Sequence, residues 1–304
     1  MQQGAQSSGR AVTAGLVGIA VAAALSACGG TAAPGPAVPT TAATASATTR
    51  SPAGTTATLS SREPTSLPVY WIGESRRSFA LYREFREVAS VGGPVSSAVS
   101  AMMSLKPLDH DYMTPWRTAS RVTASQRGQV IMVDLSADAF ANTQVGSEVA
   151  DRAVQQLVYT ATAAAQQAGT PASSVKVTVD GAPYSAWGVV RLGEPMQRAA
   201  MATVQAHTWV TSPQEGRELP AGTVTFKGFG TAFEANFVWE VRSDAGVLVA
   251  HGFTMGGSNG TFGEFTFTAR LAAGKYSVEV SGGDASGGAE GPGAAVDNKV
   301  FTVR

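Results

Sequence analysis

The stretch Gly128-Gln129-Val130-Ile131-Met132-Val133-Asp134-Leu135 decides the fold of the first half of the chain. Its density of apolar and β-branched residues predicts a buried strand. A helix is predicted after it, with Ser147 as candidate N-cap and with Gly169 and Pro171 as the stop. Ser174–Val179 alternates as another strand that ends in an Asp180-Gly181 turn. The helix has apolar residues at spacings of three and four: Ala150, Ala153, Val154, Leu157, Ala161 and Ala164.

The residues before this stretch extend the same domain toward the N-terminus. Val69–Ile72 is a short β-branched and aromatic run, which predicts a first strand ending at Gly73. In Phe79–Val88 the apolar residues fit both strand alternation and helical spacing. Pro94 opens a short helix that Pro107 ends. The order strand, strand, helix, strand, helix, strand predicts a mixed α/β domain over residues 68–190.

Three motifs of this domain resemble a known family. They are Val133-Asp134-Leu135-Ser136, Gln156-Leu157-Val158-Tyr159-Thr160 and Val177-Thr178-Val179-Asp180-Gly181, and together they resemble the GerMN domain of sporulation and germination proteins. The resemblance implies a strand at Phe79–Val88. GerMN domains also look like the ring-building modules of cell-envelope assemblies, so the resemblance implies that the chain can form a homo-oligomer through this domain.

After a predicted connector at 191–204, the pattern becomes all-β over residues 205–304. Phe233–Val241 alternates, with Phe233, Ala235, Phe237, Trp239 and Val241 expected on one face. With similar short segments at Thr208–Ser212, Thr223–Lys227, Gly246–His251, Phe265–Leu271, Tyr276–Val280 and Val300–Val303, about seven strands separated by Gly-rich turns predict an immunoglobulin-like β-sandwich.

The second domain also carries a resemblance. Val210-Thr211-Ser212-Pro213, Phe233-Glu234-Ala235-Asn236 with Trp239, Gly263-x-Phe265 and Gly274-x-Tyr276 resemble the Gmad-type immunoglobulin-like domain of spore-germination proteins. The Gly-rich Ser281–Ala295 loop departs from that pattern. The predicted fold class is therefore α+β, with an N-terminal mixed α/β GerMN-like domain and a C-terminal all-β immunoglobulin-like sandwich.

An N-terminal leader predicts where these domains work. The apolar run Ala11–Leu25 follows Arg10, carries no charge, and ends in Leu25-Ser26-Ala27-Cys28, which resembles a bacterial lipoprotein signal. The alternative, a transmembrane helix with an incidental cysteine, would need about 20 apolar residues. We expect residues 1–27 to be a signal peptide and Cys28 to carry the lipid, including palmitate, that anchors an extracytoplasmic protein in the cell membrane.

Residues 28–67 are predicted to form a disordered tether. This Ala/Thr/Pro/Ser-rich segment has no aromatic residue and charges only at Arg50, Arg62 and Glu63. It cannot bury enough apolar surface to offset the entropy of ordering. Its expected role is to hold the first domain on the order of 35 Å from the lipid.

Composition excludes several classes of partner. The chain has 22 basic and 22 acidic side chains, so nucleic acid is not an expected partner. Cys28 is the only cysteine, and His110, His207 and His251 are far apart in sequence. We therefore expect no disulfide, metal or cofactor. Asp284, Glu290 and Asp297 offer oxygen ligands, but their spacing matches no calcium loop.

Two clusters are candidates for chemistry or binding. Asp109-His110-Asp111 could form an oriented base, but neighbouring side chains in an extended segment point apart, which favours a polar loop. Trp116 beside Arg117 is a candidate partner-binding pair, and the alternative is that Trp116 packs under the neighbouring helix of its own domain.

These observations predict a non-enzymatic binding or scaffold protein of the cell envelope, related to sporulation or germination. Its expected partners are the membrane, through the lipid, and envelope proteins or wall polymer. One alternative is a cell-wall-modifying hydrolase that uses His110 with Asp109 or Asp111. A second alternative is a carrier or sensor that takes a small ligand between its domains.

Overall fold

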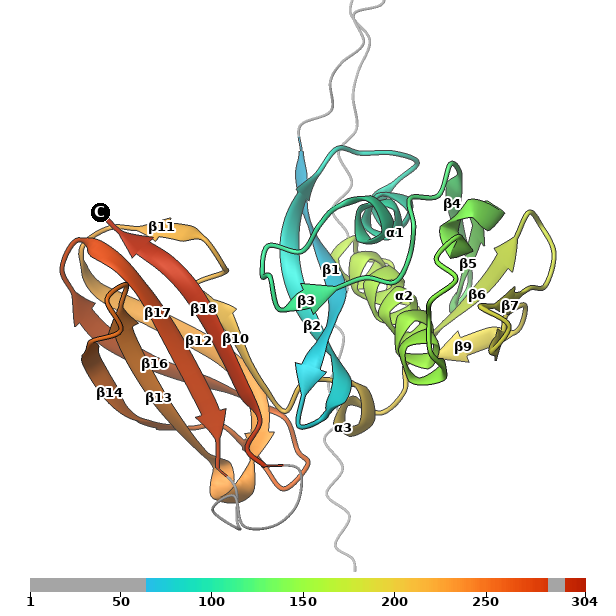
Figure 1. The fold of residues 1–304 in the computed structure, drawn as a ribbon. Coiled ribbons are helices and arrows are strands. Elements are labelled where there is room, and N and C mark those ends of the chain that lie inside the picture. Colours follow the sequence, from blue (N-terminus) through green and yellow to red (C-terminus); the bar gives the residue numbers. More distant parts are fainter. Residues whose placement is uncertain (1–63, 284–292) are drawn as a thin grey trace, which may run out of the picture. The chain divides into compact units, whose positions relative to one another are not determined.

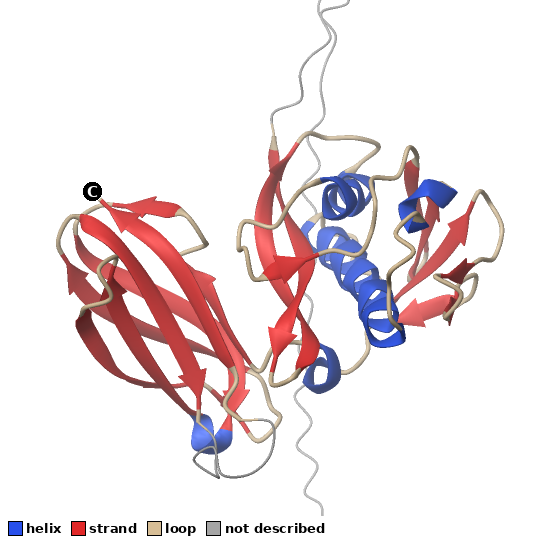
Figure 2. Ribbon diagram, viewed as in Figure 1, coloured by secondary structure: helices blue, strands red, loops and turns tan. Residues whose placement is uncertain are grey.

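The computed structural model describes residues 64–283 and 293–304, and these residues belong to one compact unit. Figures 1 and 2 show its helices and strands. The predicted leader, Cys28, nearly all of the predicted tether and most of the Ser281–Ala295 loop lie outside the described residues. Among the residues that are described, no helix has the length and apolar character needed to cross a membrane.

A long antiparallel hairpin opens the described chain. It consists of β1 (Thr65–Ser75) and β2 (Ser78–Val88), with the short β3 (Tyr112–Met113) on the other side of β1. Arg76 and Arg77 form the turn, and both have positive φ values, 50° and 65°. The strand prediction for Phe79–Val88 is confirmed.

A second sheet contains the stretch that decides the fold. Its order is β4-β5-β6-β9, and β5 and β6 are parallel neighbours while the outer pairs are antiparallel. The helix α2 connects β5 to β6, as the sequence predicts. The strand β9 lies inside the segment expected to be a connector and extends this sheet. The bounds are β4 Val122–Arg127, β5 Val130–Leu135, β6 Ser174–Val179 and β9 Pro195–Gln197, with a small hairpin of β7 Ser185–Ala186 and β8 Val190–Arg191.

Two helices lie between these sheets (Figure 2). They are α1 (Pro94–Ser104) and α2 (Ser147–Gln167), and two short helical turns, η1 (Ala137–Phe140) and α3 (Met201–Val204), lie elsewhere in the chain. The predicted N-cap is wrong by one residue. Gly146 is the N-cap of α2 and Ser147 is the first helical residue, with no side-chain capping bond. Glycine is one of the residues found often at N-caps, and Gly146 has the extended backbone conformation typical of that position.

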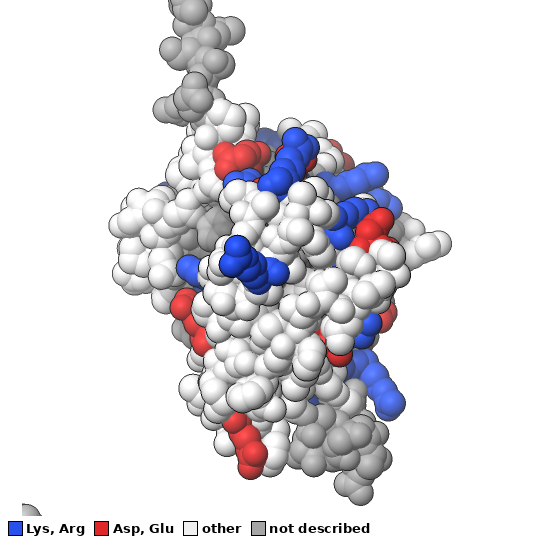
Figure 3. Space-filling model, turned by 90° about the vertical axis from the view of Figure 1, so that its left-hand side faces the viewer, with Lys and Arg blue, Asp and Glu red and all other residues white. Residues whose placement is uncertain are grey.

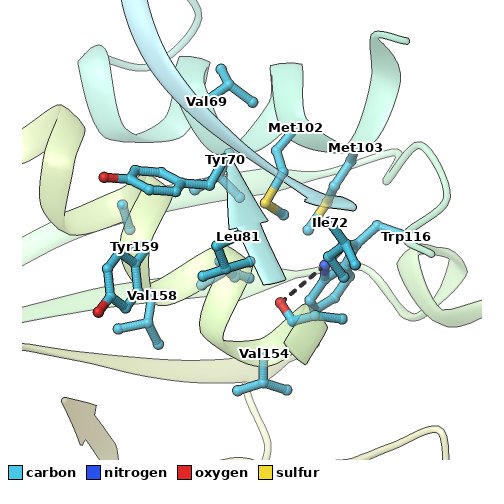
Figure 4. Packing of buried hydrophobic residues seen from close by; sticks show 14 of the residues in the cluster. Val69, Tyr70, Ile72, Leu81, Met102, Met103, Trp116, Val154, Val158 and Tyr159 are labelled. Carbon is cyan, nitrogen blue, oxygen red and sulfur yellow. Dashed lines mark hydrogen bonds between the residues drawn. The ribbon is translucent and has the colours of Figure 1, made fainter. Parts of the chain in front are cut away.

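The middle of α2 is buried on all sides and is hydrogen-bonded to the first sheet. Gln156 Nε2 donates to the Tyr70 carbonyl at 2.8 Å, and Thr160 Oγ1 accepts from the Tyr70 amide at 3.1 Å. Figure 4 shows Tyr70, Tyr159 and their neighbours packed together. These polar contacts fix the position of β1 on α2, because a buried polar group left without a partner would destabilise the fold.

The C-terminal domain is a sandwich of two sheets, which confirms the immunoglobulin-like prediction. One sheet has the order β11-β18-β17-β13-β14, and in the other β12 lies between β10 and β16 (Figure 1). Alternating inward residues such as Phe237, Phe265 and Val278 fill the core. The strands are β10 Thr208–Ser212, β11 Arg217–Leu219, β12 Gly222–Ala232, β13 Asn236–Ser243, β14 Leu248–Met255, β15 Gly257–Ser258, β16 Gly263–Leu271, β17 Gly274–Gly282 and β18 Val296–Val303.

Two details of the sandwich differ from the prediction. Phe233–Ala235 is the helical turn η2 rather than the start of a strand, and Phe233 is exposed. Glu234 and Ala235 have positive φ, so the strict alternation begins only at Phe237. The strand expected at Gly246–His251 runs from Leu248 to Met255, because Gly246 lies in the turn with a φ of 76°.

Gly228 in β12 is required by the packing of an aromatic ring. A Cβ at this position would lie 1.9 Å from the buried ring of Phe265, which faces it on β16. We expect Gly228→Ala to lower the free energy of unfolding by about 2–3 kcal/mol, since overpacking of a filled core costs about that much. Urea denaturation measures the effect. Thr225→Ala, at an exposed position of the same strand, is the control, and an equal loss in both variants would contradict the explanation.

Candidate functional site

A buried lysine is the most unusual side chain in the described structure. Lys299 lies in β18, where Asp297, Lys299, Phe301 and Val303 occupy the buried positions of the alternation. Only 5% of its side chain is exposed. Its Nζ lies 2.7 Å from Oδ2 of Asp109, 2.8 Å from the Tyr112 hydroxyl and 2.9 Å from both oxygens of Asp297. A charge that is withdrawn from water this completely requires such partners.

Asp109 is held in place by hydrogen bonds from its loop to Glu84 and within the loop itself. The carboxylate of Glu84, on β2, accepts hydrogen bonds from the backbone amides of Leu108 and Asp109 at 2.9 and 3.0 Å. Arg86 pairs with Glu84 at 3.2 Å. The Asp111 amide donates to Oδ1 of Asp109 at 2.9 Å, which leaves Oδ2 directed at Lys299. Contacts within the first domain therefore orient the side chain of Asp109 independently of Lys299.

Asp297 and Tyr112 complete the cluster. Asp297 Oδ2 accepts from the Val210 amide at 2.7 Å, and its Oδ1 accepts from the Tyr112 hydroxyl at 3.0 Å. The ring of Tyr112 stacks on Tyr82 with a centroid distance of 4.4 Å. We call Asp109, Tyr112, Asp297 and Lys299 the buried cluster.

Burial and charge compete within this cluster. Burial raises the pKa of Asp297, and Lys299 opposes that shift without cancelling it. Burial lowers the pKa of Lys299, but Asp297 and Asp109 outweigh it, so the net pKa is above the ordinary value. The pKa of Tyr112 is raised well above its ordinary value, first by burial and then by the two carboxyls.

The three residues Asp109, His110 and Asp111 do not converge on one point. Asp109 is buried against Lys299, whereas His110 and Asp111 are exposed. Asp111 Oδ2 accepts a hydrogen bond from Asn298 at 3.3 Å. The carboxylate of Asp109 is thus not placed to orient His110 as a base.

Trp116 is packed inside its own domain. Its indole is 2% exposed, and Nε1 donates to the Ala153 carbonyl of α2 at 3.3 Å (Figure 4). The ring makes edge contacts with Phe140 and Trp187 at 5.0 and 4.9 Å. This placement favours the alternative that Trp116 supports the neighbouring helix. Arg117 is exposed, so only Arg117 of this pair offers its side chain at the surface.

Asp297, considered above as a calcium ligand, is committed to Lys299 and Val210. Asp284 and Glu290 lie outside the described residues. Within residues 64–283 and 293–304, no group of three or more His, Cys, Asp or Glu side chains is arranged to hold a metal ion.

A second feature is a cavity of about 300 Å³ with basic and aromatic walls. Three cations line it, Arg83 from β2, Arg198 after β9 and Lys227 from β12, against the single carboxylate of Glu264. The guanidinium of Arg83 lies 5.3 Å from the ring centroid of Trp209. Other lining residues are Tyr70, Met201, Gln205, Thr211, Phe229 and Phe265.

Two polar atoms at this cavity have no partner within the described residues. They are Nε of Arg83 and Oε1 of Gln205, and Gln205 is only 4% exposed. Both atoms are almost completely inaccessible to solvent, so they are buried polar atoms without a partner beside the cavity and not contacts that its surface offers. A cavity with net positive charge, a planar guanidinium and aromatic walls suits an anion that carries an apolar or sugar-like part.

An apolar strip lies on the outer face of the sandwich. Phe253 and Met255 of the edge strand β14 are 72% and 58% exposed, and Val238 of β13 lies opposite Phe253. Exposed apolar patches of this kind mark surfaces where proteins contact other molecules. On the face shown in Figure 3, basic and acidic side chains are both scattered, with broad uncharged areas between them.

Some of these features could be read from the sequence and others could not. The signal for the buried cluster is the alternation in β18, which puts Asp297 and Lys299 in phase with Phe301. No sequence signal joins Lys299 to Asp109, 190 positions away. Arg83 and Lys227 are likewise brought together only by the fold.

Comparison with known families agrees with this architecture. Residues 68–185 match the family described as sporulation and spore germination, named Germane, and residues 207–289 match the family described as the immunoglobulin-like domain of bacterial spore germination, Gmad2. The chain therefore carries a Germane domain followed by a Gmad2 domain, in the order predicted from the sequence. The two matches support a germination-related role.

Comparisons with individual proteins identify no relative on which a function can be based. No curated protein matches the chain. Among solved structures, CopC from Methylosinus trichosporium OB3b is 22% identical, and the alignment covers 32% of this chain and 93% of that one with a TM-score of 0.24. An engineered protein is 14% identical, with coverage of 50% of this chain and 36% of that one and a TM-score of 0.27.

Loss of the cation should strongly destabilise the protein. Lys299→Met leaves two buried carboxyls without their partner, so we expect the free energy of unfolding in urea to fall by about 3–5 kcal/mol. Lys275→Met is the matched control, because Lys275 pairs with Asp244 at an exposed site and should cost less than about 1 kcal/mol. Similar small losses in both variants would show that Lys299 does not support the fold.

Proposed function

We propose that this protein is an exported, lipid-anchored, non-enzymatic binding protein of the cell envelope. In this proposal its Germane and Gmad2 domains together hold an anionic segment of wall polymer. The observation that carries it is the cavity of about 300 Å³, to which the first domain contributes Arg83 and the second contributes Lys227. Binding of an anion, rather than catalysis, suits a site whose charged groups are three cations and a single carboxylate.

The cavity selects for charge and for shape. Cations that surround a partly enclosed space attract phosphate or carboxylate groups, and the low local dielectric strengthens that attraction. Phe229 is only partly buried and offers its ring to the apolar part of a ligand, whereas Trp209 is buried and supports Phe229 by an edge contact at 5.9 Å. A polymer segment that combines an anion with a sugar or alcohol backbone meets both requirements.

The lipid anchor is supported by the sequence alone. Leu25-Ser26-Ala27-Cys28 follows an apolar run too short to span a bilayer, and two acyl chains on Cys28 give stable attachment where one is marginal. The long segment between Cys28 and β1 would let the cavity reach material away from the membrane.

The hydrolase alternative has less support. It requires His110 beside an oriented carboxylate, but the Asp109 carboxylate is turned to Lys299 and His110 is exposed. Self-association through the Germane domain stays a prediction of the resemblance to ring-building modules.

Removal of cavity cations tests the proposed ligand. We expect Arg83→Gln and Lys227→Gln each to weaken binding to purified cell wall at least about tenfold at low salt, since one charge-assisted hydrogen bond is worth about 1.5–3 kcal/mol. Cosedimentation measures the affinity. Arg270→Gln removes an exposed charge farther along β16 and should leave binding nearly unchanged. Equal losses in all three variants would indicate a non-specific charge effect and contradict the proposal.

A second candidate is the carrier or sensor of a small soluble anion, which the limited cavity volume favours. The same variants distinguish the two functions. The small-anion function is favoured if glycerol phosphate binds, if that binding depends on Arg83 and Lys227, and if purified cell wall does not bind. Wall binding that withstands an excess of glycerol phosphate would support the polymer.

Substitution of the cysteine tests the anchor. We expect Cys28→Ala to move the protein from the membrane fraction to the soluble fraction of lysed cells, because both acyl chains are lost. Ser26→Ala keeps a small residue before the cysteine and should remain in the membrane fraction. A Cys28→Ala variant that stays quantitatively membrane-bound would contradict lipidation at this residue.

A further inference from the structure

Lys299 and Asp109 place an amine and a carboxyl group in contact inside the protein. Nζ of Lys299 lies 2.7 Å from Oδ2 of Asp109, and both side chains are 5% exposed. A carbon–oxygen bond is about 1.2 Å long, so the carboxyl carbon lies within about 3.9 Å of the nitrogen. Contact of this kind between two reacting groups replaces a collision between separate molecules and removes a large entropic barrier.

A second carboxyl group lies against the same nitrogen. Both oxygens of Asp297 are 2.9 Å from Nζ of Lys299, and Oδ1 also accepts from Tyr112. Asp297 is therefore placed to take a proton from the amine and to return one to a departing oxygen, which are the two tasks of a general acid–base catalyst.

We propose that Lys299 and Asp109 join in an intramolecular amide bond, formed with Asp297 as proton carrier. The neutral amine of Lys299 attacks Cγ of Asp109, and a carbon–nitrogen bond forms. Asp297 accepts a proton from the nitrogen and passes it to Oδ2 of Asp109, which already carries the proton that it received from Lys299. The carbon–oxygen bond to Oδ2 then breaks and one water molecule leaves. No oxidant, reductant or cofactor takes part, and Asp297 ends in the protonation state in which it began.

The proton count of the buried cluster permits this reaction. Transfer of one proton from Lys299 to Asp109 gives an amine and a carboxylic acid without a change in total charge. Burial alone disfavours the charged form of both groups, but Asp297 and Asp109 hold the pKa of Lys299 above its ordinary value, so the neutral amine is the minor form from which the reaction proceeds.

Groups next to Asp109 and Lys299 support the later steps of amide formation. The Asp111 amide donates to Oδ1 of Asp109 at 2.9 Å, and Oδ1 is the oxygen on which negative charge develops when the carbon is attacked. The stacked rings of Tyr82 and Tyr112 cover the site, which keeps bulk water from reversing the reaction. Glu84 fixes the loop, so Asp109 cannot turn away from Lys299.

Such a bond would link the two domains covalently. Asp109 belongs to the loop between α1 and β3, and Lys299 belongs to the last strand of the sandwich. Residues 190 positions apart would be joined, so the cavity between Arg83 and Lys227 would keep its shape under tension or partial unfolding. The inference does not depend on which ligand the cavity holds.

Mass spectrometry of the purified folded protein tests the proposal. The wild-type chain should be lighter than its sequence by one water molecule, and a protease digest should contain a branched peptide that joins the Asp109 and Lys299 segments. Lys299→Arg keeps the positive charge but cannot form this amide, so it should have the full mass. A succinimide at Asp180-Gly181 would also remove one water molecule, but it would form in Lys299→Arg as well. The variant therefore distinguishes the succinimide from the Lys299–Asp109 amide.

Asp297→Asn tests the proton carrier. We expect the linked fraction of this variant to accumulate at least about tenfold more slowly after refolding from urea, since general acid–base catalysis contributes about that much or more. Wild-type protein that keeps the full mass after prolonged incubation, with no branched peptide, would overturn the proposal and leave the cluster as an ion pair. A linked fraction that forms equally fast in Asp297→Asn would overturn the role of Asp297. If Asp297→Asn does not refold, the wild-type mass still decides the main question.

Discussion

The ammonium group of Lys299, withdrawn from water, is the constraint on which much of the structure depends. A buried cation is tolerated only when its partners are in place, and here the partners come from distant parts of the chain. Asp297 lies two residues away on the same strand, whereas Asp109 and Tyr112 come from a loop and strand of the other domain. The sandwich supplies one carboxyl partner of its lysine, and the Germane domain supplies the other together with the Tyr112 hydroxyl. The cluster therefore joins the two domain types within one compact unit.

Regular elements could be predicted well because their signals are local. The alternation of Phe237, Trp239 and Val241 and the helical spacing after Ser147 each report which face of an element is buried, and the structure confirms both. Errors occurred where backbone conformation overrides the pattern. Phe233 continues the alternation in sequence, but the positive φ values of Glu234 and Ala235 turn the chain and leave Phe233 in solvent.

The sites were harder to predict because they are built from residues that are distant in sequence. In the sequence Asp109 is a candidate catalytic residue because it adjoins His110. In the structure its side chain contacts Lys299 and the amide of Asp111. In the sequence Asp297 is only one of three scattered oxygen ligands that match no calcium loop, and its buried partner Lys299 could not be recognised there. Arg83 and Lys227 occupy ordinary surface positions of two strands and become a site only when those strands face each other across the cavity.

The central claim is that the two domains behave as one cooperative unit because the buried cluster joins them. Amide hydrogen exchange tests this claim most directly at Val210 and Asp109, whose amides donate to Asp297 and Glu84. If the claim is correct, both amides exchange only through global unfolding, with the same opening free energy as the core amides of β5. If both exchange rapidly while β5 stays protected, the domains separate in solution and the account is contradicted.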